Sequence, residues 1–292
     1  MLNKMWKIIF LIFLSSCADD TATNSTTIIN PENLNIMTWN IESFPKTNQT
    51  IGYVTQIINS LDVDIVALQE IEDTASLSEL ANSLDGNWAY YRSSDGDYKE
   101  LSYLINTDKI SINNFSNPEE INMSNEDAYN FAYRPPYILE FNYNNQDIIL
   151  INIHFKCCSD DNAPFRRIQA SNYLDSYISN NHYNDNVIVI GDFNDSLIDD
   201  ENVFDVFLNK PQEYTFADYS MAQQSNEWAY WSFPTWPSHI DHVLISNELF
   251  DEYQHEESTC YTLLVDQEFS NYASYDDNVS DHRPVIISLK IN

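Results

Sequence analysis

The residues best suited to chemistry are acids, amides and imidazoles that stand where apolar runs begin or end. They are Asn40, Glu70, His154, Asp192, Asn194, Asp241, Asp281 and His282. Each has an ordinary explanation when taken alone: Glu70 as an acid near a helix start, Asp281 as a turn residue, and His154 as a core histidine. Taken together, so many polar strand ends favour one shared site.

The chemistry that this set allows is the hydrolysis of a phosphoester. Oxygen ligands from Glu70, Asn40 and Asp281 suit Mg²⁺ or Mn²⁺, with Ca²⁺ as an alternative. The imidazoles and the remaining carboxylates can move protons, because a carboxylate beside an imidazole raises its pKa and fixes its tautomer. We therefore predict a site that binds a divalent metal and transfers protons.

The stretch "VIVIGDFND" (187–195) shows how such a residue could be positioned. Four apolar residues predict a buried strand, and the strand ends at Gly191 and Asp192. A plain turn is the alternative, since Gly, Asp and Asn are favoured in turns. We interpret Asp192 as a carboxylate that a rigid sheet holds over a reacting phosphorus.

The apolar pattern predicts the elements that must position these residues. Strands are expected over 34–41, 64–71, 101–106, 137–143, 147–155, 241–246 and 283–291, and helices over 49–61 and 163–180. Helices are few between the middle strands, which favours two packed mixed sheets over a doubly wound parallel sheet. No repeat and no long linker interrupts the chain from residue 34 to 292, so we expect one domain.

The charge of the chain limits its partners. Among 292 residues, 45 acids stand against 13 Lys and Arg, which gives a net charge of −32. Tight tracking of nucleic acid needs a basic stripe, so this composition disfavours it and indicates a need for divalent cations. A solvated acidic surface in a salty medium is the alternative explanation.

The first residues predict export. Lys4 and Lys7 precede "IIFLIFL", an apolar run too short to span a bilayer, and the following "LSSC" resembles a bacterial lipoprotein cleavage box. Residues 1–17 would then be a signal peptide that ends at a lipidated Cys17, and 18–33 a flexible tether. We expect a secreted lipoprotein held on a bacterial membrane by this anchor only, with Asp19 and Asp20 as a weak signal for the outer membrane or cell surface. No protein partner can be inferred.

Three further cysteines remain: Cys157, Cys158 and Cys260. Adjacent cysteines rarely pair with each other, so a disulfide from Cys157 or Cys158 to Cys260 is the expectation for an exported chain. A zinc site is the alternative, but it lacks a second close pair of ligands.

Six motifs in chain order carry a resemblance to a known family. "TWNI", "LQEI", "INIHF", "GDFN", "IDHVLIS" and "SDHRPV" resemble the endonuclease/exonuclease/phosphatase superfamily over residues 34–292. "SYLIN" preceded by "DYKE", and "YRPP" at 133–136, are similar to its deoxyribonuclease-like branch. The resemblance implies an α+β fold, a four-layer α/β/β/α sandwich of two mixed sheets flanked by helices.

The resemblance also implies roles for the metal-binding and water-activating residues. Glu70 would be the principal metal ligand, with Asn40 and Asp281 close by. Asp192 would orient or deprotonate the attacking water, and Asn194 would help to hold that water and the phosphate.

Further roles concern protons and the substrate phosphate. His154 with Glu100 behind it would form one acid/base pair, and His282 with Asp241 behind it the other. The sequence does not assign which imidazole is the base. Arg134 would grip a phosphate oxygen, and Arg166 and Arg167 are weaker candidates for which a solvated helix face is the preferred interpretation.

Two departures from the resemblance bear on the substrate. Duplex-cutting relatives carry arginines just after "WNI" and "LQE", whereas this chain has Glu42 and Glu72, which would repel a duplex backbone. The predicted function is a divalent-metal-dependent phosphodiester hydrolase, an extracytoplasmic nuclease. One alternative is the same machinery acting on a small phosphoester or a phospholipid head group, as in sphingomyelinases. The aromatic loop 226–237 would then face lipid, although it could equally stack bases or simply pack. A non-catalytic surface binding module is the third hypothesis.

Overall fold

The computed structural model describes residues 29–94, 100–112, 118–158, 161–224 and 226–291. The predicted signal peptide, the lipidation site Cys17 and the tether up to residue 28 lie outside these residues. Within the described part, none of the helices is both long enough and apolar enough to cross a bilayer.

Two mixed sheets form the centre of the molecule. The strands of the first sheet are, in spatial order, β12 (Thr259–Thr262), β13 (Val285–Leu289), β1 (Leu34–Phe44), β2 (Ile65–Ile71), β4 (Glu100–Asn106) and β3 (Trp88–Arg92). Those of the second are β10 (Tyr214–Phe216), β11 (Asp241–Ser246), β9 (Asn186–Asp192), β8 (Gln146–His154), β7 (Tyr137–Tyr143) and β5 (Ser111–Ile112), and β6 (Glu119–Glu120) also pairs with β7. The pairs β1–β2 and β8–β9 are parallel, and the other pairs are antiparallel.

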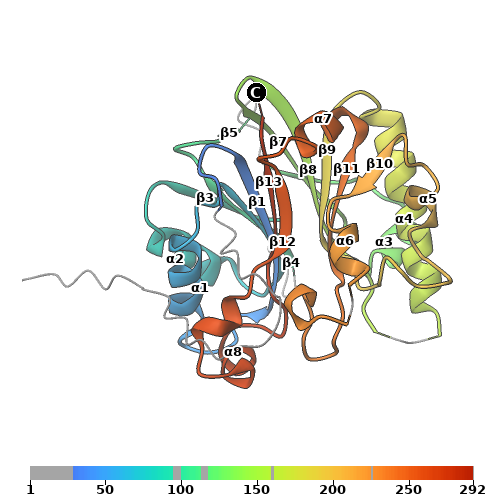
Figure 1. The fold of residues 1–292 in the computed structure, drawn as a ribbon. Helices are drawn as coiled ribbons and strands as arrows, with labels where there is room; N and C mark the ends of the chain where they lie inside the picture. The colour runs from blue at the N-terminus through green and yellow to red at the C-terminus, as the bar shows by residue number, and fades with distance from the viewer. Residues whose placement is uncertain (1–28, 95–99, 113–117, 159–160, 225, 292) are drawn as a thin grey trace, which may run out of the picture.

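Helices cover the outer faces of both sheets. The main ones are α1 (Thr50–Asn59) and α2 (Thr74–Ser83) on the first sheet, and α4 (Ala163–Asn181) with α5 (Asp205–Leu208) on the second (Figure 1). Shorter helices are α3 (Asn125–Asn130), α6 (Tyr219–Ala222), α7 (Phe250–Tyr253), α8 (Tyr272–Asn278), and the 3₁₀ turns Trp228–Tyr230, Asn247–Leu249 and Val265–Glu268. The predicted four-layer sandwich is confirmed.

Alternation along the strands separates three apolar cores. On β1, Ile36 packs between the two sheets, while Trp39 packs outward with Val54 of α1. On β9, Ile190 packs between the sheets, and Val189 faces the helical layer of the second sheet. Because the central strands β1, β2, β8 and β9 are buried on both faces over most of their length, their near-continuous apolar runs in the sequence are accounted for.

At the end of the predicted tether, Ile29 and Asn33 are buried against the domain. Ile29 is 7% exposed and packs in the core beneath α1 and α2. Asn33 is fully buried, and its Nδ2 donates hydrogen bonds to Glu257 O at 2.8 Å and to Ser288 Oγ at 3.1 Å. The polar composition of this segment concealed these contacts, which fix it against β13.

The disulfide prediction is also wrong, because Cys157, Cys158 and Cys260 are free thiols. Cys260 lies on the edge strand β12 of the first sheet, opposite Ile287. The adjacent pair instead follows β8 in the middle of the second sheet. The thiol of Cys260 therefore belongs to one sheet, and the thiols of Cys157 and Cys158 follow a strand of the other. Burial also raises the pKa of the Cys260 thiol well above its usual value.

Candidate active site

The site residues share one face because strand side chains alternate with a period of two. Asp192 lies two residues after the core residue Ile190 on β9, and Asp241 two residues before Val243 on β11. In the same way, His154 lies four residues after the core residue Leu150 on β8, and therefore on the same face of the strand. All three side chains therefore point between the sheets, where the apolar core gives way to polar groups.

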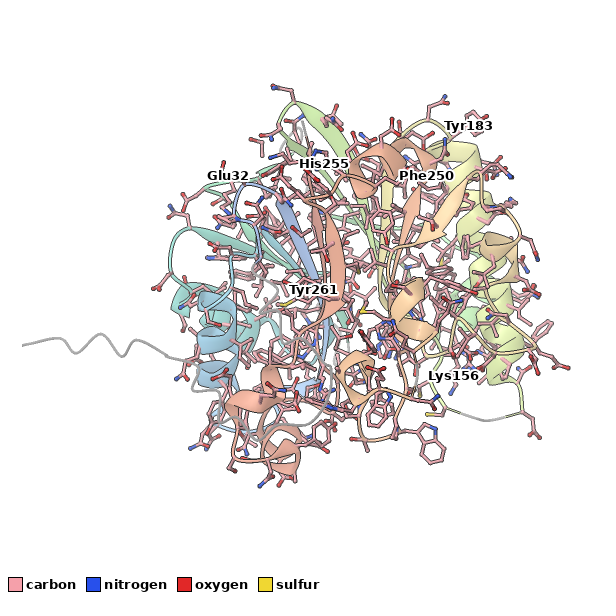
Figure 2. All side chains as sticks on the ribbon, viewed as in Figure 1. Glu32, Lys156, Tyr183, Phe250, His255 and Tyr261 are labelled. Atoms are coloured by element: carbon pink, nitrogen blue, oxygen red, sulfur yellow. The ribbon has the colours of Figure 1, made fainter. Side chains whose placement is uncertain are left out.

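Strand register brings these residues to one end of the molecule. His154 pairs with Asp192 in the parallel β8–β9 ladder, and Asp192 pairs with Asp241 across the antiparallel β9–β11 ladder. Lys156, two residues beyond the end of β8, lies at the opposite end of the molecule from Glu32 and His255 (Figure 2). The strand ends predicted to carry chemistry thus meet at a single edge of the sandwich.

Irregular backbone at the ends of β1 and β2 directs two acids into the same region. The β1–β2 register shifts between Asn40 and Phe44, and Glu42 and Ser43 have positive φ angles of 29° and 51°. Glu70 has a φ of 65°, and its Oε2 accepts a hydrogen bond from Ser43 N at 3.1 Å. Such conformations are costly for residues other than glycine and cluster at functional sites, where a bulge re-aims a side chain.

Asp192 is the centre of the site. It is 1% exposed, and its Oδ2 lies 3.0 Å from Asn40 Nδ2, 3.4 Å from His154 Nε2 and 3.9 Å from His282 Nε2. Its Oδ1 accepts the backbone N–H of Asn194 at 2.9 Å. Burial, reinforced by the nearby Asp241 charge, raises the pKa of Asp192 to about 7, which suits a base at neutral pH.

His282 lies between two carboxylates, Asp241 and Asp192. Its Nδ1 lies 2.8 Å from Asp241 Oδ2, and its ring packs on Phe233 with the ring centres 4.6 Å apart. Burial alone would lower the pKa of His282, but the Asp241 carboxylate and then Asp192 outweigh it and raise the pKa to about 10. The predicted pairing of His282 with Asp241 is therefore present.

The predicted metal ligands form an acidic group beside Asp192. Burial, opposed by His282 and reinforced by the Glu42 and Glu70 carboxylates, raises the pKa of Asp281 to about 6. Lys46 forms ion pairs with Glu42 and Asp276. Asn40 Oδ1 accepts Glu42 N at 3.1 Å and retains a second lone pair. Carboxylate and amide oxygens fit a hard divalent cation, so Glu70, Asp281 and Asn40 are suited to hold one.

Three other predicted residues lie near this group. Asn194, with a φ of 55°, donates from Nδ2 to Phe155 O at 3.3 Å. Glu100 is buried at the start of β4 and accepts a hydrogen bond from Ser93 Oγ at 2.8 Å, and its role behind His154 stays a prediction. Arg134 is 7% exposed, and its Nη2 donates to His154 O at 3.3 Å and Phe155 O at 3.0 Å, so it supports the end of β8.

The interpretation of Arg166 and Arg167 as a solvated helix face is wrong. Both are buried on α4. Arg166 lies over the Tyr129 ring at 3.9 Å, and Arg167 binds Asp195 Oδ2 at 2.7 Å and Lys156 O at 2.8 Å. Helical spacing alone did not reveal these partners, because they come from α3 and from the segments that follow β8 and β9.

A second polar cluster was missed in the sequence. Asp218, His239 and His242 bring their side-chain atoms within 4.8 Å of one another, and all three are buried. "SHIDH" held two histidines around Asp241, which was a signal, but their partner Asp218 lies more than 20 residues earlier.

We expect Gly191→Ala to lower the free energy of unfolding by about 3 kcal/mol or more. Gly191 has a φ of 151°, and a Cβ there would lie 2.0 Å from Ile153 O, so the strand that carries Asp192 would have to move. Gly52→Ala is the control, because a Cβ at this exposed helical position meets nothing within 4 Å. Urea unfolding of both variants checks this, and equal stabilities would contradict it.

We expect His282 to stabilise the metal-free protein in a pH-dependent way. Its folded pKa is raised to about 10. The contribution is therefore fully present below the unfolded pKa of about 6.5 and is lost as the pH rises through about 10. In excess chelator, the free energy of unfolding in urea should fall more steeply with pH over this range for the wild type than for His282→Gln. Parallel curves would show that His282 is neutral in the folded protein.

The comparisons with known proteins identify the family of this chain. The model of the Endonuclease/Exonuclease/phosphatase family matches residues 37–282, and the chain belongs to that family of hydrolases. Its members are phosphodiesterases and phosphatases that use divalent metals. The comparison with curated protein sequences finds no match.

Several solved structures share the fold of this chain. A complex of D. rerio TDP2 with single-strand DNA product has a TM-score of 0.64 at 15% identity, covering 89% of this chain and 99% of that one. The Bacteroides thetaiotaomicron mannosyl-6-phosphatase has a TM-score of 0.59 at 15% identity, covering 88% and 100%. The human Nocturnin catalytic domain with bound sulfate has a TM-score of 0.62 at 14% identity, covering 91% and 97%.

Proposed function

We propose that this protein is a divalent-metal-dependent phosphodiesterase, acting outside the cytoplasm as a nuclease. The observation that carries the proposal is the environment of Asp192, where one buried carboxylate oxygen faces the Nε2 atoms of both His154 and His282. Asp192, which can act as a base, and His282, which can act as an acid, are therefore neighbours. Hydrolysis at phosphorus needs both.

Each side chain has a distinct task in this proposal. Asp192, with a pKa of about 7, orients a water and accepts its proton. His282 holds a proton on Nε2 at neutral pH, since its Nδ1 faces Asp241, and gives it to the departing oxygen. Asn194 is fixed beside Asp192 and orients the water and a phosphate oxygen. His154 contacts the same carboxylate and can take up the proton afterwards.

A divalent cation held by Glu70, Asp281 and Asn40 would neutralise charge on the phosphate and polarise it. Asp281 Oδ1 lies 3.9 Å from His282 Nε2, and the Glu70 charge acts on the same Asp281 carboxyl.

A small phosphoester is the second candidate substrate. The contacts of the arginine side chains near the site favour it. Arg134, Arg166 and Arg167 donate to backbone carbonyls, and the net charge is −32, so a long basic footprint is lacking among the residues described around the site. Trp236 is 76% exposed in the turn that follows Phe233, whose ring packs on His282. This tryptophan can stack on a base or on the apolar face of a sugar, which suits single strands and small esters.

A substrate panel tests the proposal. Purified protein is assayed on bis(p-nitrophenyl) phosphate, single-stranded DNA, duplex DNA, RNA, sphingomyelin, mannose 6-phosphate and p-nitrophenyl phosphate with Mg²⁺, Mn²⁺ or Ca²⁺. Turnover of diesters that stops in chelator supports the proposal. Turnover of monoesters alone would select the second candidate, and no turnover of any ester would leave a binding module.

The proposed location outside the cytoplasm depends on Cys17. We expect Cys17→Ser to release the protein from the membrane fraction or leave it unprocessed, because the residue would lose its acyl chains. Fractionation of bacterial cells and mass spectrometry of the N-terminus check this. A wild-type chain with intact Met1 in the cytosol would contradict it.

A further inference from the structure

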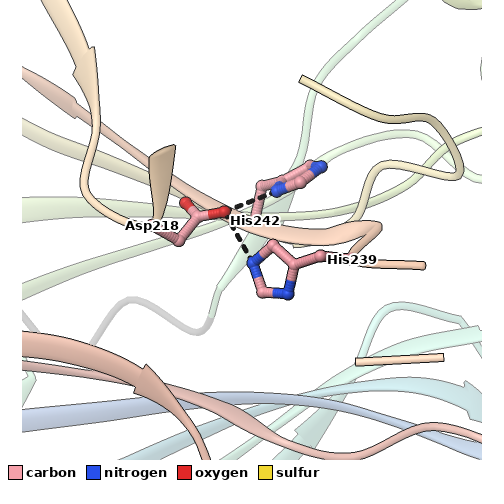
Figure 3. Close-up of side chains that lie close together, drawn as sticks. All are labelled: Asp218, His239 and His242. Atoms are coloured by element: carbon pink, nitrogen blue, oxygen red, sulfur yellow. Dashed lines mark hydrogen bonds and ion pairs between the residues drawn. The ribbon is translucent and has the colours of Figure 1, made fainter. Parts of the chain in front are cut away.

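The cluster of Asp218, His239 and His242 lies at the start of β11, beside the catalytic Asp241. Asp218 Oδ2 lies 2.5 Å from His242 Nδ1 and 2.9 Å from His239 Nε2, and its Oδ1 accepts Val243 N at 2.9 Å (Figure 3). One carboxylate therefore holds three of the residues around Asp241. Asp218 is fully buried, and it belongs to the segment just before α6.

His242 extends these contacts to the neighbouring strand end. Its Nε2 lies 2.9 Å from Asp195 O, in the loop that follows Asp192 and contains Asn194. A carbonyl can only accept, so Nε2 must donate to it, and Nδ1 must donate to the Asp218 carboxylate. His242 is thus a doubly protonated imidazolium in a cage of Phe193, Phe204 and Phe216, with ring centres 5.4 to 5.9 Å away.

The contacts continue to the third strand end. The Asp195 carboxylate binds Arg167 Nε at 2.7 Å, and Arg167 Nη1 donates to Lys156 O at 2.8 Å, two residues beyond His154. A buried chain of charged groups therefore runs behind the second sheet from β11 to β9 to β8. These three strands deliver Asp241, Asp192 and His154 on the opposite face.

The distances favour hydrogen bonds over a metal in this cluster. Ligand atoms at about 2.0–2.1 Å from a tetrahedral zinc ion are separated by about 3.3 Å. The two Asp218–histidine distances, 2.9 and 2.5 Å, are shorter than that. They match charge-assisted hydrogen bonds to a carboxylate.

We propose that Asp218 is a positioning residue for catalysis, which sets the three catalytic strand ends through His242 and Asp195. The inference rests on the proposed hydrolytic function and deepens it. Because Asp218 contacts no reacting atom, its loss should displace the catalytic side chains slightly and lower kcat, while the binding of a small diester changes little.

The test compares Asp218→Asn with Asp64→Asn. Asp64 is a matched control: it is also fully buried, accepts Asn35 N at 2.8 Å and pairs with Lys109 at 2.8 Å. It stands before β2, at the strand ends remote from the site. For bis(p-nitrophenyl) phosphate, Asp218→Asn should lower kcat about 10- to 100-fold per folded molecule with KM within about twofold. Asp64→Asn should keep kcat within about twofold of the wild type.

A second variant and a spectrum keep the proposal testable if Asp218→Asn folds poorly. Asp218→Asn/His242→Gln replaces the ion pair by two amides and should restore part of kcat. In the wild type, ¹⁵N NMR of His242 should show both ring nitrogens protonated at neutral pH.

Four results would overturn the proposal: equal kcat for Asp218→Asn and wild type, equal losses of kcat in Asp218→Asn and Asp64→Asn, a neutral His242 ring, or one equivalent of zinc that only Asp218→Asn loses. An inactive wild type would instead contradict the proposed function, so the two failures are distinguishable.

Discussion

Asp192→Asn should lower kcat by about 10³-fold or more while the protein stays folded. The variant removes the only carboxylate in the described structure that faces both His154 and His282, so the water loses its base. Initial rates on bis(p-nitrophenyl) phosphate at saturating Mg²⁺ measure the loss.

Stability should not fall in this variant. The folded pKa of Asp192 is raised to about 7, above its unfolded value of 3.8, mainly by burial. As the pH rises through this interval the buried carboxyl ionises at a cost, and a neutral amide removes that cost. A thermal midpoint equal to or above the wild-type value at pH 8, together with lost activity, is expected. An active variant, or an unfolded one, would contradict the assignment.

Glu70→Gln should lower the affinity for Mg²⁺ by about 100-fold or more, because removal of even an outer partner of a metal ligand costs about 10- to 100-fold. Glu70 and Asp281 are the acids whose like charges meet beside Asp192. Isothermal titration with Mg²⁺ measures the affinity, and excess Mg²⁺ should recover part of the activity. Glu72→Gln, two residues further along the chain, is the matched control and should bind Mg²⁺ with the wild-type affinity.

An unchanged affinity in Glu70→Gln would place the cation elsewhere. Loss of binding in Asp281→Asn alone would then identify Asp281 as the principal ligand.

Much of the fold could be predicted because the apolar runs are long and regular. The runs at 137–143 and 241–246 coincide with β7 and β11, and the helix expected over 163–180 ends within one residue of α4. A strand buried on both faces has a near-continuous apolar signature, which sequence reasoning can find. The contacts of Asn33 could not be found in this way, because its partners Glu257 and Ser288 are more than 200 residues away.

The positions of site residues could be predicted where those residues stand at the ends of paired strands. Asp192 and Asp241 come together because β9 and β11 pair, and each keeps the face of its strand. The Asp218 cluster was not predictable, because its geometry depends on where the segment before α6 lies against β11. Arg167 likewise acts through Asp195, a contact that helical periodicity does not report.

Metal-dependent diester hydrolysis is tested most directly by the initial rate of bis(p-nitrophenyl) phosphate hydrolysis by the wild-type protein as a function of free Mg²⁺. We expect no turnover in excess chelator, a saturable rise on addition of Mg²⁺, and release of one p-nitrophenol for each diester cleaved. Full turnover in excess chelator, or none at any Mg²⁺ concentration while the protein is folded, would contradict it.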